Sequence, residues 1–260
     1  MKHTFVICAY QKSEYLEACI KSLKRQSIPS EILMVTSTLN EHISGLAESY
    51  GIPLIVNEGE GGITQDWNFA LSQVKTEYAT IAHQDDKYEP YYTEKLLRKA
   101  GEAEHPLILF SDYYELRGRK KVYQSKMLKI KRFLLAPLRI GAFSSSIFVR
   151  RRVLSLGDPI CCPSVMFCLK NLQQPIFRNY YRSCEDWEAW EKISREKGDF
   201  LYVAEPLMCH RIHEDSETSK IIQDGKRVQE NYEMYCKFWP APLAGLINHF
   251  YTDSEKSNKL

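Results

Sequence analysis

The chain has 260 residues, 44% of them hydrophobic, and a formal net charge of +2. This length and composition suffice for one large folded domain and exclude a largely disordered chain. The first residues are too short in apolar length for a secretory leader, and no window approaches the ~20 apolar residues of a membrane span, so we expect a cytoplasmic protein.

Short apolar strands alternate with helical patterns in the amino-terminal part of the chain. Strands are expected at 4–8, 32–35, 53–56, 78–82 and 107–110, and helices at 14–25, 41–49, 64–74 and 91–100. This alternation predicts βαβ units and a parallel sheet about five strands wide by residue 111. Ligands bind beyond the carboxyl ends of such strands, so 9–11, 36–38 and 83–86 are expected to converge on one crevice.

After residue 111 the alternation weakens. The patterns indicate a strand at 144–149, a loop at 158–175, a helix at 185–197, a strand at 200–203 and a helix at 219–238. The simplest account is an α/β domain over residues 1–215, with halves 1–111 and 112–215. A helical carboxyl-terminal extension over 216–260 follows it.

The segment from Arg117 to Arg152 contains twelve lysines and arginines and no acidic residue. Two interpretations stay open. The segment is either a solvated face balanced by acidic groups nearby in space, or an edge that meets the phosphates of a nucleotide, a lipid headgroup or a nucleic acid.

Eight cysteines are scattered through apolar contexts. Without an export signal we interpret them as reduced thiols and not as a disulfide framework. Cys161 and Cys162 are adjacent, but no second pair follows at zinc spacing, so we do not expect a zinc site.

Asp85 and Asp86 follow the apolar strand at 78–82. Two adjacent carboxylates repel each other unless a cation neutralises them, and oxygen ligands suit Mg²⁺ or Mn²⁺. The alternative is a structural pair whose oxygens accept backbone N–H groups ahead of the next helix. The dipeptide alone favours this alternative.

Two further clusters contain chemistry-bearing side chains. Glu185 and Asp186 open a helix, where acidic residues either complement the helix dipole or supply a general base. Arg211 and His213 follow a strand; Arg211 suits a phosphate, and His213 a phosphate or a metal, although a surface pair is the simpler interpretation.

The order of these motifs resembles family 2 glycosyltransferases, which have the GT-A fold and transfer a sugar from a nucleotide diphosphate. The resemblance rests on five motifs within about residues 4–220: VICAYQ at 6–11, the segment 61–68, HQDD at 83–86, Glu185-Asp186, and Arg211-Ile212-His213. It implies a GT-A-like α/β domain with a mostly parallel central sheet flanked by helices.

The resemblance also implies roles for individual residues. Asp186 would be the catalytic base with Glu185 as its acidic neighbour, and Asp85, Asp86 and His213 would hold Mg²⁺ or Mn²⁺. The residues expected to contact the nucleotide sugar are Ala9, Tyr10, Gln11, Thr36, Ser37, Thr38, Gly62, Asp66, Trp67, Asn68, His83, Gln84, Asp85, Arg211 and His213.

Three positions depart from the family pattern. Thr36-Ser37-Thr38 stands where paired aspartates are usual, His83 replaces the first aspartate of the metal motif, and Trp67 replaces an arginine that commonly precedes Asn68.

The function implied is inverting transfer of a sugar from a nucleotide-diphosphate donor to a hydroxyl acceptor, in surface polysaccharide or glycoconjugate assembly. A UDP-sugar is the first expectation for the donor, followed by dTDP- and GDP-sugars. The acceptor would be a saccharide or lipid-linked saccharide at the inner face of the membrane, with the basic segment 117–152 and residues 238–247 in peripheral contact. The alternative is a non-catalytic nucleotide-sugar or glycan binder on the same scaffold. We expect no nucleic-acid partner, because no recognition motif is present.

Overall fold

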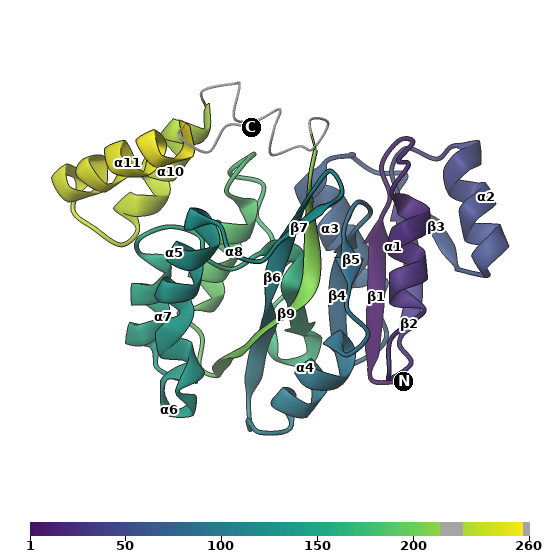
Figure 1. The fold of residues 1–260 in the computed structure, drawn as a ribbon, viewed down its shortest axis with the longest axis horizontal. Coiled ribbons are helices and arrows are strands. Elements are labelled where there is room, and N and C mark those ends of the chain that lie inside the picture. Colours follow the sequence, from purple (N-terminus) through teal and green to yellow (C-terminus); the bar gives the residue numbers. More distant parts are fainter. Residues whose placement is uncertain (214–225, 257–260) are drawn as a thin grey trace.

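The computed structural model describes residues 1–213 and 226–256. A central sheet runs through the molecule, with helices packed around it and the carboxyl-terminal helices at one side (Figure 1). The described helices before the carboxyl-terminal extension are α1 Leu16–Leu23, α2 Glu41–Tyr50, α3 Ile63–Ser72, α4 Tyr92–Ala100, α5 Lys126–Leu135, α6 Gly141–Ser144, α7 Ile147–Leu154 and α8 Glu185–Ile193. Short 3₁₀ turns are η1 Ala136–Arg139, η2 Cys162–Ser164 and η3 Leu169–Asn171.

Nine strands of the described residues form one mixed sheet. They are β1 His3–Cys8, β2 Glu31–Thr36, β3 Leu54–Val56, β4 Tyr78–His83, β5 Lys87–Tyr88, β6 Pro106–Arg117, β7 Lys120–Val122, β8 Val165–Cys168 and β9 Asp199–Ile212. The order is β3-β2-β1-β4-β8-β6-β9-β5, with β7 on β6. Strands β1 to β4, β6 and β9 run in one direction, whereas β5, β7 and β8 are antiparallel to their neighbours.

The amino-terminal half follows the predicted alternation. Helix α1 buries Leu16, Cys19, Ile20 and Leu23, which recur at helical spacing. The cap residue of this helix is Tyr15, and the Ser13 hydroxyl accepts the Tyr15 N–H at 3.2 Å.

The predicted loop at 158–175 contains a strand, which is a correction. Strand β8 is only four residues long and lies antiparallel between β4 and β6, so β6 is separated from the four adjacent parallel strands. Val165 and Phe167 pack in one core and Met166 and Cys168 in the other, because alternate residues of a strand face opposite sides. A four-residue run between prolines is too short for periodicity to reveal.

The predicted strand at 144–149 is wrong, because these residues belong to α6 and α7. Ser146 caps α7 by accepting the Val149 N–H at 3.3 Å. One turn later, Arg150 is fully buried and donates to the carbonyls of Gly198 and Glu196 at 2.6 and 2.7 Å. These tertiary bonds outweigh the strand preference of the β-branched residues Ile147 and Val149.

The carboxyl-terminal extension contains two described helices, α10 Lys226–Cys236 and α11 Ala241–Lys256. Tyr235 of α10 lies edge-on to Trp187 of α8, with ring centroids 5.1 Å apart. Trp239 donates from Nε1 to the Ser155 carbonyl at 2.7 Å. The beginning of the helix expected at 219–238, including Ile222, lies outside the described residues.

The eight cysteines all lie in the described part of the chain, as free thiols. Over residues 1–213 and 226–256, no helix has the length and apolar character needed to cross a membrane.

Candidate active site

Three turns meet at the carboxyl edge of the parallel strands. Gln84, after β4, bonds to both sides of the Tyr10 backbone: its Oε1 accepts the Tyr10 N–H and its Nε2 donates to the Tyr10 carbonyl, each at 3.0 Å. Gln11 has φ of 52° and donates its N–H to Oγ1 of Thr38 at 2.6 Å. A positive φ is costly for a residue with a side chain, so these bonds hold the Tyr10–Gln11 turn in shape.

The carboxylate of Asp66 holds the turn after β2 in place. Ser37 donates from Oγ to Oδ2 of Asp66 at 2.7 Å, and Asn57 donates to Oδ1 at 2.8 Å. Thr36 accepts the N–H of Thr38 at 3.0 Å through its hydroxyl. Asp66 therefore supports the wall formed by Thr36-Ser37-Thr38, with both carboxylate oxygens bonded.

Gly62 comes directly before helix α3, at a position where the side chain of Gln65 leaves no room for a Cβ. Gly62 has φ of 148°, and a Cβ there would lie 2.4 Å from Oε1 of Gln65. Further along, Trp67 stacks on His83 with centroids 5.3 Å apart and contacts the ring of Phe177 at 4.9 Å. Asn68 donates to the Phe177 carbonyl at 2.8 Å and accepts its N–H at 3.0 Å. The side chain of Asn68 thus fastens the loop 172–184 to α3.

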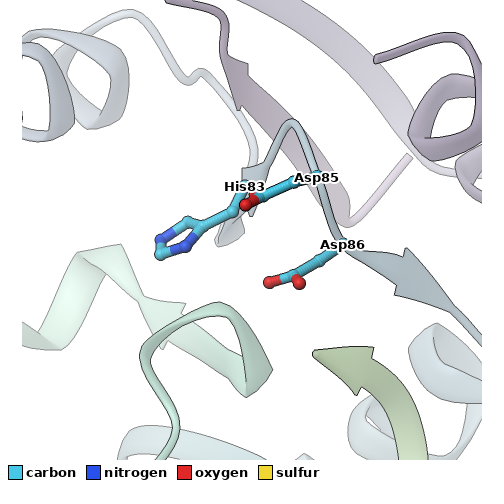
Figure 2. Close-up of side chains that lie close together, drawn as sticks. All are labelled: His83, Asp85 and Asp86. Carbon is cyan, nitrogen blue, oxygen red and sulfur yellow. The ribbon is translucent and has the colours of Figure 1, made fainter. Parts of the chain in front are cut away.

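The turn at 83–86 contains three side chains with possible ligand atoms. Figure 2 shows His83, Asp85 and Asp86 projecting from one turn at the end of β4. In the described residues, one ligand atom from each of the three lies within 4.8 Å of the others. His83, which we had placed only with the nucleotide sugar, therefore joins this group, whereas His213 bonds through Nε2 to Oδ2 of Asp85 at 2.8 Å.

Asp86 is the more enclosed of the two carboxylates, at 1% exposure. Its Oδ1 accepts the N–H of Arg211 at 2.8 Å and lies 3.2 Å from Nδ1 of His210. Burial acts to lower the pKa of His210, but the charges of Asp86 and Asp85 outweigh it and hold that pKa above its ordinary value. Asp86 therefore has a structural role, but it anchors the end of β9 to the turn and does not cap the following helix α4, whose cap residue is Tyr91.

Asp85 and Arg211 present polar groups at the same edge. Burial acts to raise the pKa of Asp85, but the His83 charge, the hydrogen bond from His213 and the His210 charge hold that pKa below its ordinary value. Arg211 donates from Nε to the Asp85 carbonyl at 2.9 Å, and its guanidinium lies 4.1 Å from the centroid of the Tyr15 ring. Asp85 is thus kept ionised beside a fixed cation.

The residues present fit a divalent cation. Nε2 of His83 is buried and has no hydrogen-bond partner among the described residues, and an unpaired buried polar atom is costly. The ionised Asp85 is an oxygen donor of the kind that Mg²⁺ and Mn²⁺ prefer, and imidazole is a better donor for Mn²⁺ than for Mg²⁺.

Glu185 and Asp186 lie in the first turn of α8, as expected. Oδ1 of Asp186 accepts the N–H of Trp187 at 2.8 Å. Burial, with the charges of Asp186 and Glu230, raises the pKa of Glu185 to about 8. Glu230 of α10 also accepts the N–H and hydroxyl of Ser183 at 2.8 and 2.5 Å, so the extension holds the loop that leads into this turn.

The charges of both carboxylate clusters affect the pKa of one thiol, Cys161. Burial raises the pKa of Cys161 well above its ordinary value; Lys131 opposes this, and the charges of Asp86, Asp158 and Asp186 add to it. Asp158 and Lys131 were not among the residues predicted for the site. Asp158 fell in a presumed loop, and Lys131 could not be distinguished within the basic run.

A hollow of about 360 Å³ opens beside this site. It is lined by Thr64, Gln65, Asn68, Pro175, Phe177, Arg178, Asn179 and Tyr180. The lining comes from the start of α3 and from the loop 172–184, which leads directly to Asp186. Tyr180 is 72% exposed, and the Arg178 guanidinium lies 5.9 Å from the centroid of its ring.

The basic segment 117–152 is partly balanced by nearby carboxylates. Ion pairs join Arg117 to Glu115 at 3.0 Å, Arg132 to Asp112 at 2.6 Å, Lys121 to Glu89 at 3.8 Å and Arg151 to Glu191. The first of the two interpretations therefore holds for these four cations. On the same segment, Phe133 and Phe148 are 78% and 72% exposed.

Comparison with known proteins agrees with this geometry. The family model for glycosyl transferase family 2 matches residues 4–167. An uncharacterised glycosyltransferase of Rickettsia typhi is 22% identical over 236 residues, which cover 90% of this chain and 71% of the relative. The crystal structure of residues 1–349 of S. aureus TarS in complex with UDP-GlcNAc superposes with a TM-score of 0.65 at 16% identity, covering 100% of this chain and 74% of that one.

A second solved structure has the same fold. The mannosyltransferase PcManGT from Pyrobaculum calidifontis, in complex with GDP-Man and Mn²⁺, gives a TM-score of 0.65 at 13% identity and covers 96% of this chain and 69% of that one. The chain spans 44% of the longer TarS chain. The expected GT-A fold is confirmed by these neighbours. The chain belongs to glycosyl transferase family 2, and it is a glycosyltransferase.

Proposed function

We propose that this enzyme transfers a sugar from a nucleotide-diphosphate donor to a hydroxyl acceptor by a single displacement that inverts the anomeric centre. The observation that carries the proposal is the convergence of the turns after β1, β2 and β4 with Arg211, at one edge of the sheet. Asn68 of α3 is hydrogen-bonded to both backbone groups of Phe177 in the loop that leads to Asp186, which supports placing a donor and a base in the same crevice.

Glycosyl transfer develops positive charge at the anomeric carbon and negative charge on the departing diphosphate. Asp186 would accept the proton of the acceptor hydroxyl as that oxygen attacks. Arg211, fixed by Tyr15 and by the Asp85 carbonyl, would face the diphosphate. Because its orientation is set before the reaction, its charge requires little reorganisation as the leaving group forms.

His83 and Asp85 would hold Mg²⁺ or Mn²⁺, and Asp86 would keep their turn attached to β9. A bound divalent cation supplies charge neutralisation for the leaving diphosphate. His213 orients Asp85 through their hydrogen bond. Hydrogen-bond partners of metal ligands commonly orient those ligands in this way.

For the donor, we propose a UDP-sugar first and GDP- or dTDP-sugars next. The TarS and PcManGT structures contain UDP-GlcNAc and GDP-Man. In this chain Ser37 and Thr38 are partly exposed and have hydroxyls where the family pattern has carboxylates, whereas Thr36 is buried. Hydroxyls both donate and accept hydrogen bonds, so they can contact a base or a ribose without the desolvation cost of a charged pair.

For the acceptor, we propose a saccharide that occupies the hollow beside α3. Tyr180 offers an exposed ring, and Arg178, Asn179 and Gln65 offer polar groups. An apolar face rimmed by a few polar groups is typical of small-molecule sites.

We further propose that the acceptor is lipid-linked, in surface polysaccharide assembly, and that α5 and α7 contact the membrane. The exposed Phe133 and Phe148 lie among basic residues, a combination that favours anionic bilayers. Co-sedimentation with anionic vesicles at low salt should be lost in the Phe133→Ser, Phe148→Ser variant, and failure of the wild type to sediment removes this part of the proposal.

The central test is a transfer and hydrolysis assay with UDP-, GDP- and dTDP-sugars, with and without Mn²⁺ or Mg²⁺. The matching donor should raise the melting temperature in a thermal-shift screen, because it binds only the folded protein. Turnover that depends on this donor supports the proposal. Binding without any transfer or hydrolysis would instead identify a non-catalytic nucleotide-sugar binder.

A further inference from the structure

Among the described residues that line the hollow beside α3, Arg178 alone is charged. The other lining side chains are apolar or neutral polar, and none of them is acidic. The loop 172–184, which supplies most of this lining, contains Arg178 and Arg182 and no aspartate or glutamate. A ligand in the hollow therefore meets a positive charge from the described residues that line it, and no negative one.

Glu188 of α8 forms ion pairs with two cations. Its carboxylate is 1% exposed, and Oε1 accepts from Nη1 of Arg178 at 3.3 Å and from Nζ of Lys237 at 3.2 Å. One buried negative charge is thus shared by two cations, which leaves one positive charge in excess within this cluster. Arg178 is the more exposed of the two cations, at 47% of its side chain compared with 24% for Lys237. The excess charge is therefore presented at the hollow.

A third cation lies behind the same loop. Lys192 of α8 donates from Nζ to two backbone carbonyls of the loop, at 3.1 and 2.8 Å. Burial, followed by the charge of Arg178, lowers the pKa of Lys192 below its ordinary value, although Glu188 and Glu196 oppose this. The effect of Arg178 on Lys192 exceeds that of Glu188, as expected if Glu188 does not neutralise this arginine fully.

The guanidinium group of Arg178 keeps most of its donors for a ligand. An arginine has five N–H donors in a planar fork, and within the described part of the chain the hydrogen bond that Arg178 makes is the one to Glu188. The guanidinium also lies 5.9 Å from the centroid of the Tyr180 ring, which is 72% exposed. Carboxylates and phosphates accept two parallel bonds from such a fork.

We propose that the acceptor saccharide carries an anionic group, a phosphate or a carboxylate, and that Arg178 is the residue that selects it. This inference rests on the proposed glycosyl transfer and names the class of its acceptor. The anionic group accepts bonds from the remaining donors of Arg178, and the exposed Tyr180 ring offers an apolar face to the sugar beside it. A neutral saccharide would leave the excess positive charge at the hollow without a partner.

Binding at Arg178 can be measured by NMR without any turnover. The probes are glucose 6-phosphate for a phosphate, glucuronate for a carboxylate, and glucose as their neutral match. The ¹H–¹⁵N signals of the arginine Nε–H groups report on the site, and the Arg178 signal is the one missing from Arg178→Lys. At least one anionic probe should shift this signal in a saturable way, and the probe that does so identifies the anion; glucose should not shift it. A shift confined to the Arg211 signal would place the anion at the donor site and overturn the inference.

Arg178→Gln should weaken binding of the effective anionic probe by at least about tenfold, because charge-assisted hydrogen bonds are lost. Calorimetric titration measures this loss. The control is Arg98→Gln, which removes the same charge from an exposed position on α4 outside the hollow and should bind the probe as the wild type does. Equal affinities of Arg178→Gln and Arg98→Gln for the probe overturn the inference.

Anion binding and glycosyl transfer fail separately. Glucose that binds as tightly as the anionic probes, or an Arg178 signal that responds to neither anion, removes the anionic acceptor and leaves glycosyl transfer intact. A protein that binds an anionic probe through Arg178 but transfers no sugar removes the proposed function instead. If Arg178→Gln does not fold, Arg178→Lys takes its place; it should also bind the probe more weakly, because a lysine cannot form the two parallel bonds.

Discussion

The ring of His83 lies between a stacking partner and two carboxylates. Trp67 covers one face, with centroids 5.3 Å apart, and the buried Nε2 has no partner among the described residues. The family pattern puts an aspartate at this position, where a third negative charge would add to those of Asp85 and Asp86. An imidazole lowers the local negative charge and changes the donor set from oxygen alone to oxygen and nitrogen.

Removal of this imidazole should weaken Mn²⁺ binding. His83→Ala removes a donor atom. Mutation of a residue that only hydrogen-bonds a metal ligand already lowers metal affinity by about 10–100-fold, so we expect Mn²⁺ affinity to fall by at least about tenfold. Calorimetric titration of Mn²⁺ in the presence of the donor nucleotide measures it. His105→Ala, an exposed histidine next to the start of β6, is the control. Equal Mn²⁺ affinities in His83→Ala and the wild type would exclude His83 from the site.

Replacement of Asp186 tests the proposed base directly. Asp186→Asn keeps the acceptor for the Trp187 N–H but cannot take a proton, so kcat should fall by about 10²–10⁴-fold. The donor should bind as before in an equilibrium measurement, because the base contributes mainly to the transition state. Turnover comparable to that of the wild type would show that another group removes the acceptor proton.

For single residues, the sequence predicted which residue types form the site, but it predicted fewer of their contacts. Asp85, Asp186 and Arg211 were identified from their motifs, and the structure gives each a defined environment. Glu230 was not identified, because its partner Ser183 lies 47 positions earlier in the chain and no short-range pattern links them.

At the scale of elements, the loop 172–184 is bonded to α3, beside the proposed donor site, and leads to α8, which contains the proposed base Asp186. Asn68 of α3 holds it through both backbone groups of Phe177, and Glu230 of α10 holds it through Ser183. A loop tied at two points can present Asp186 in a constant orientation, which is what an active-site base requires.

Loss of the hydrogen bonds between Asn68 and the Phe177 backbone should destabilise the enzyme. Asn68→Ala leaves the N–H and carbonyl of Phe177 without partners, which costs about 1–3 kcal/mol of unfolding free energy. Denaturant unfolding measures this loss. Asn179→Ala, an exposed asparagine on the same loop, should change stability by less than about 0.5 kcal/mol. Equal stabilities of the two variants would show that the Asn68 bonds do not hold the loop.

For the whole molecule, the buried Glu185 makes stability depend on pH. Its pKa is about 8 in the folded enzyme, compared with the ordinary value of 4.5. Between these values the folded state binds one more proton than the unfolded state, so the free energy of unfolding falls by about 1.4 kcal/mol per pH unit as pH rises. The full loss is on the order of 3–5 kcal/mol and is complete above pH 8.

Glu185→Gln should remove this dependence. The amide resembles the protonated carboxyl group, so the variant and the wild type should melt at similar temperatures at pH 5. At pH 9 the variant should melt several degrees higher, since ~1 kcal/mol corresponds to about 2–4 °C for a chain of this size. Melting curves from pH 5 to 9 measure the difference, with the exposed Glu196→Gln as control. Parallel curves for wild type and Glu185→Gln would contradict the assignment.

The sequence by itself determined the local elements and the residue types of the site. Period-two and period-3.6 patterns gave β1 to β4 with their helices, because each element buries one face or one run of apolar residues. It also placed HQDD and Glu185-Asp186 at element ends. These features depend on neighbours a few residues away, which a sequence pattern contains.

The tertiary structure decided the rest. Strand β8 owes its place between β4 and β6 to partners far along the chain, and α7 forms around the buried Arg150, which is bonded to carbonyls 46 and 48 residues away. The hydrogen bonds from Ser183 to Glu230 likewise depend on packing α10 against the loop 172–184. Such contacts arise when the whole core is buried, and no local pattern of residues specifies them.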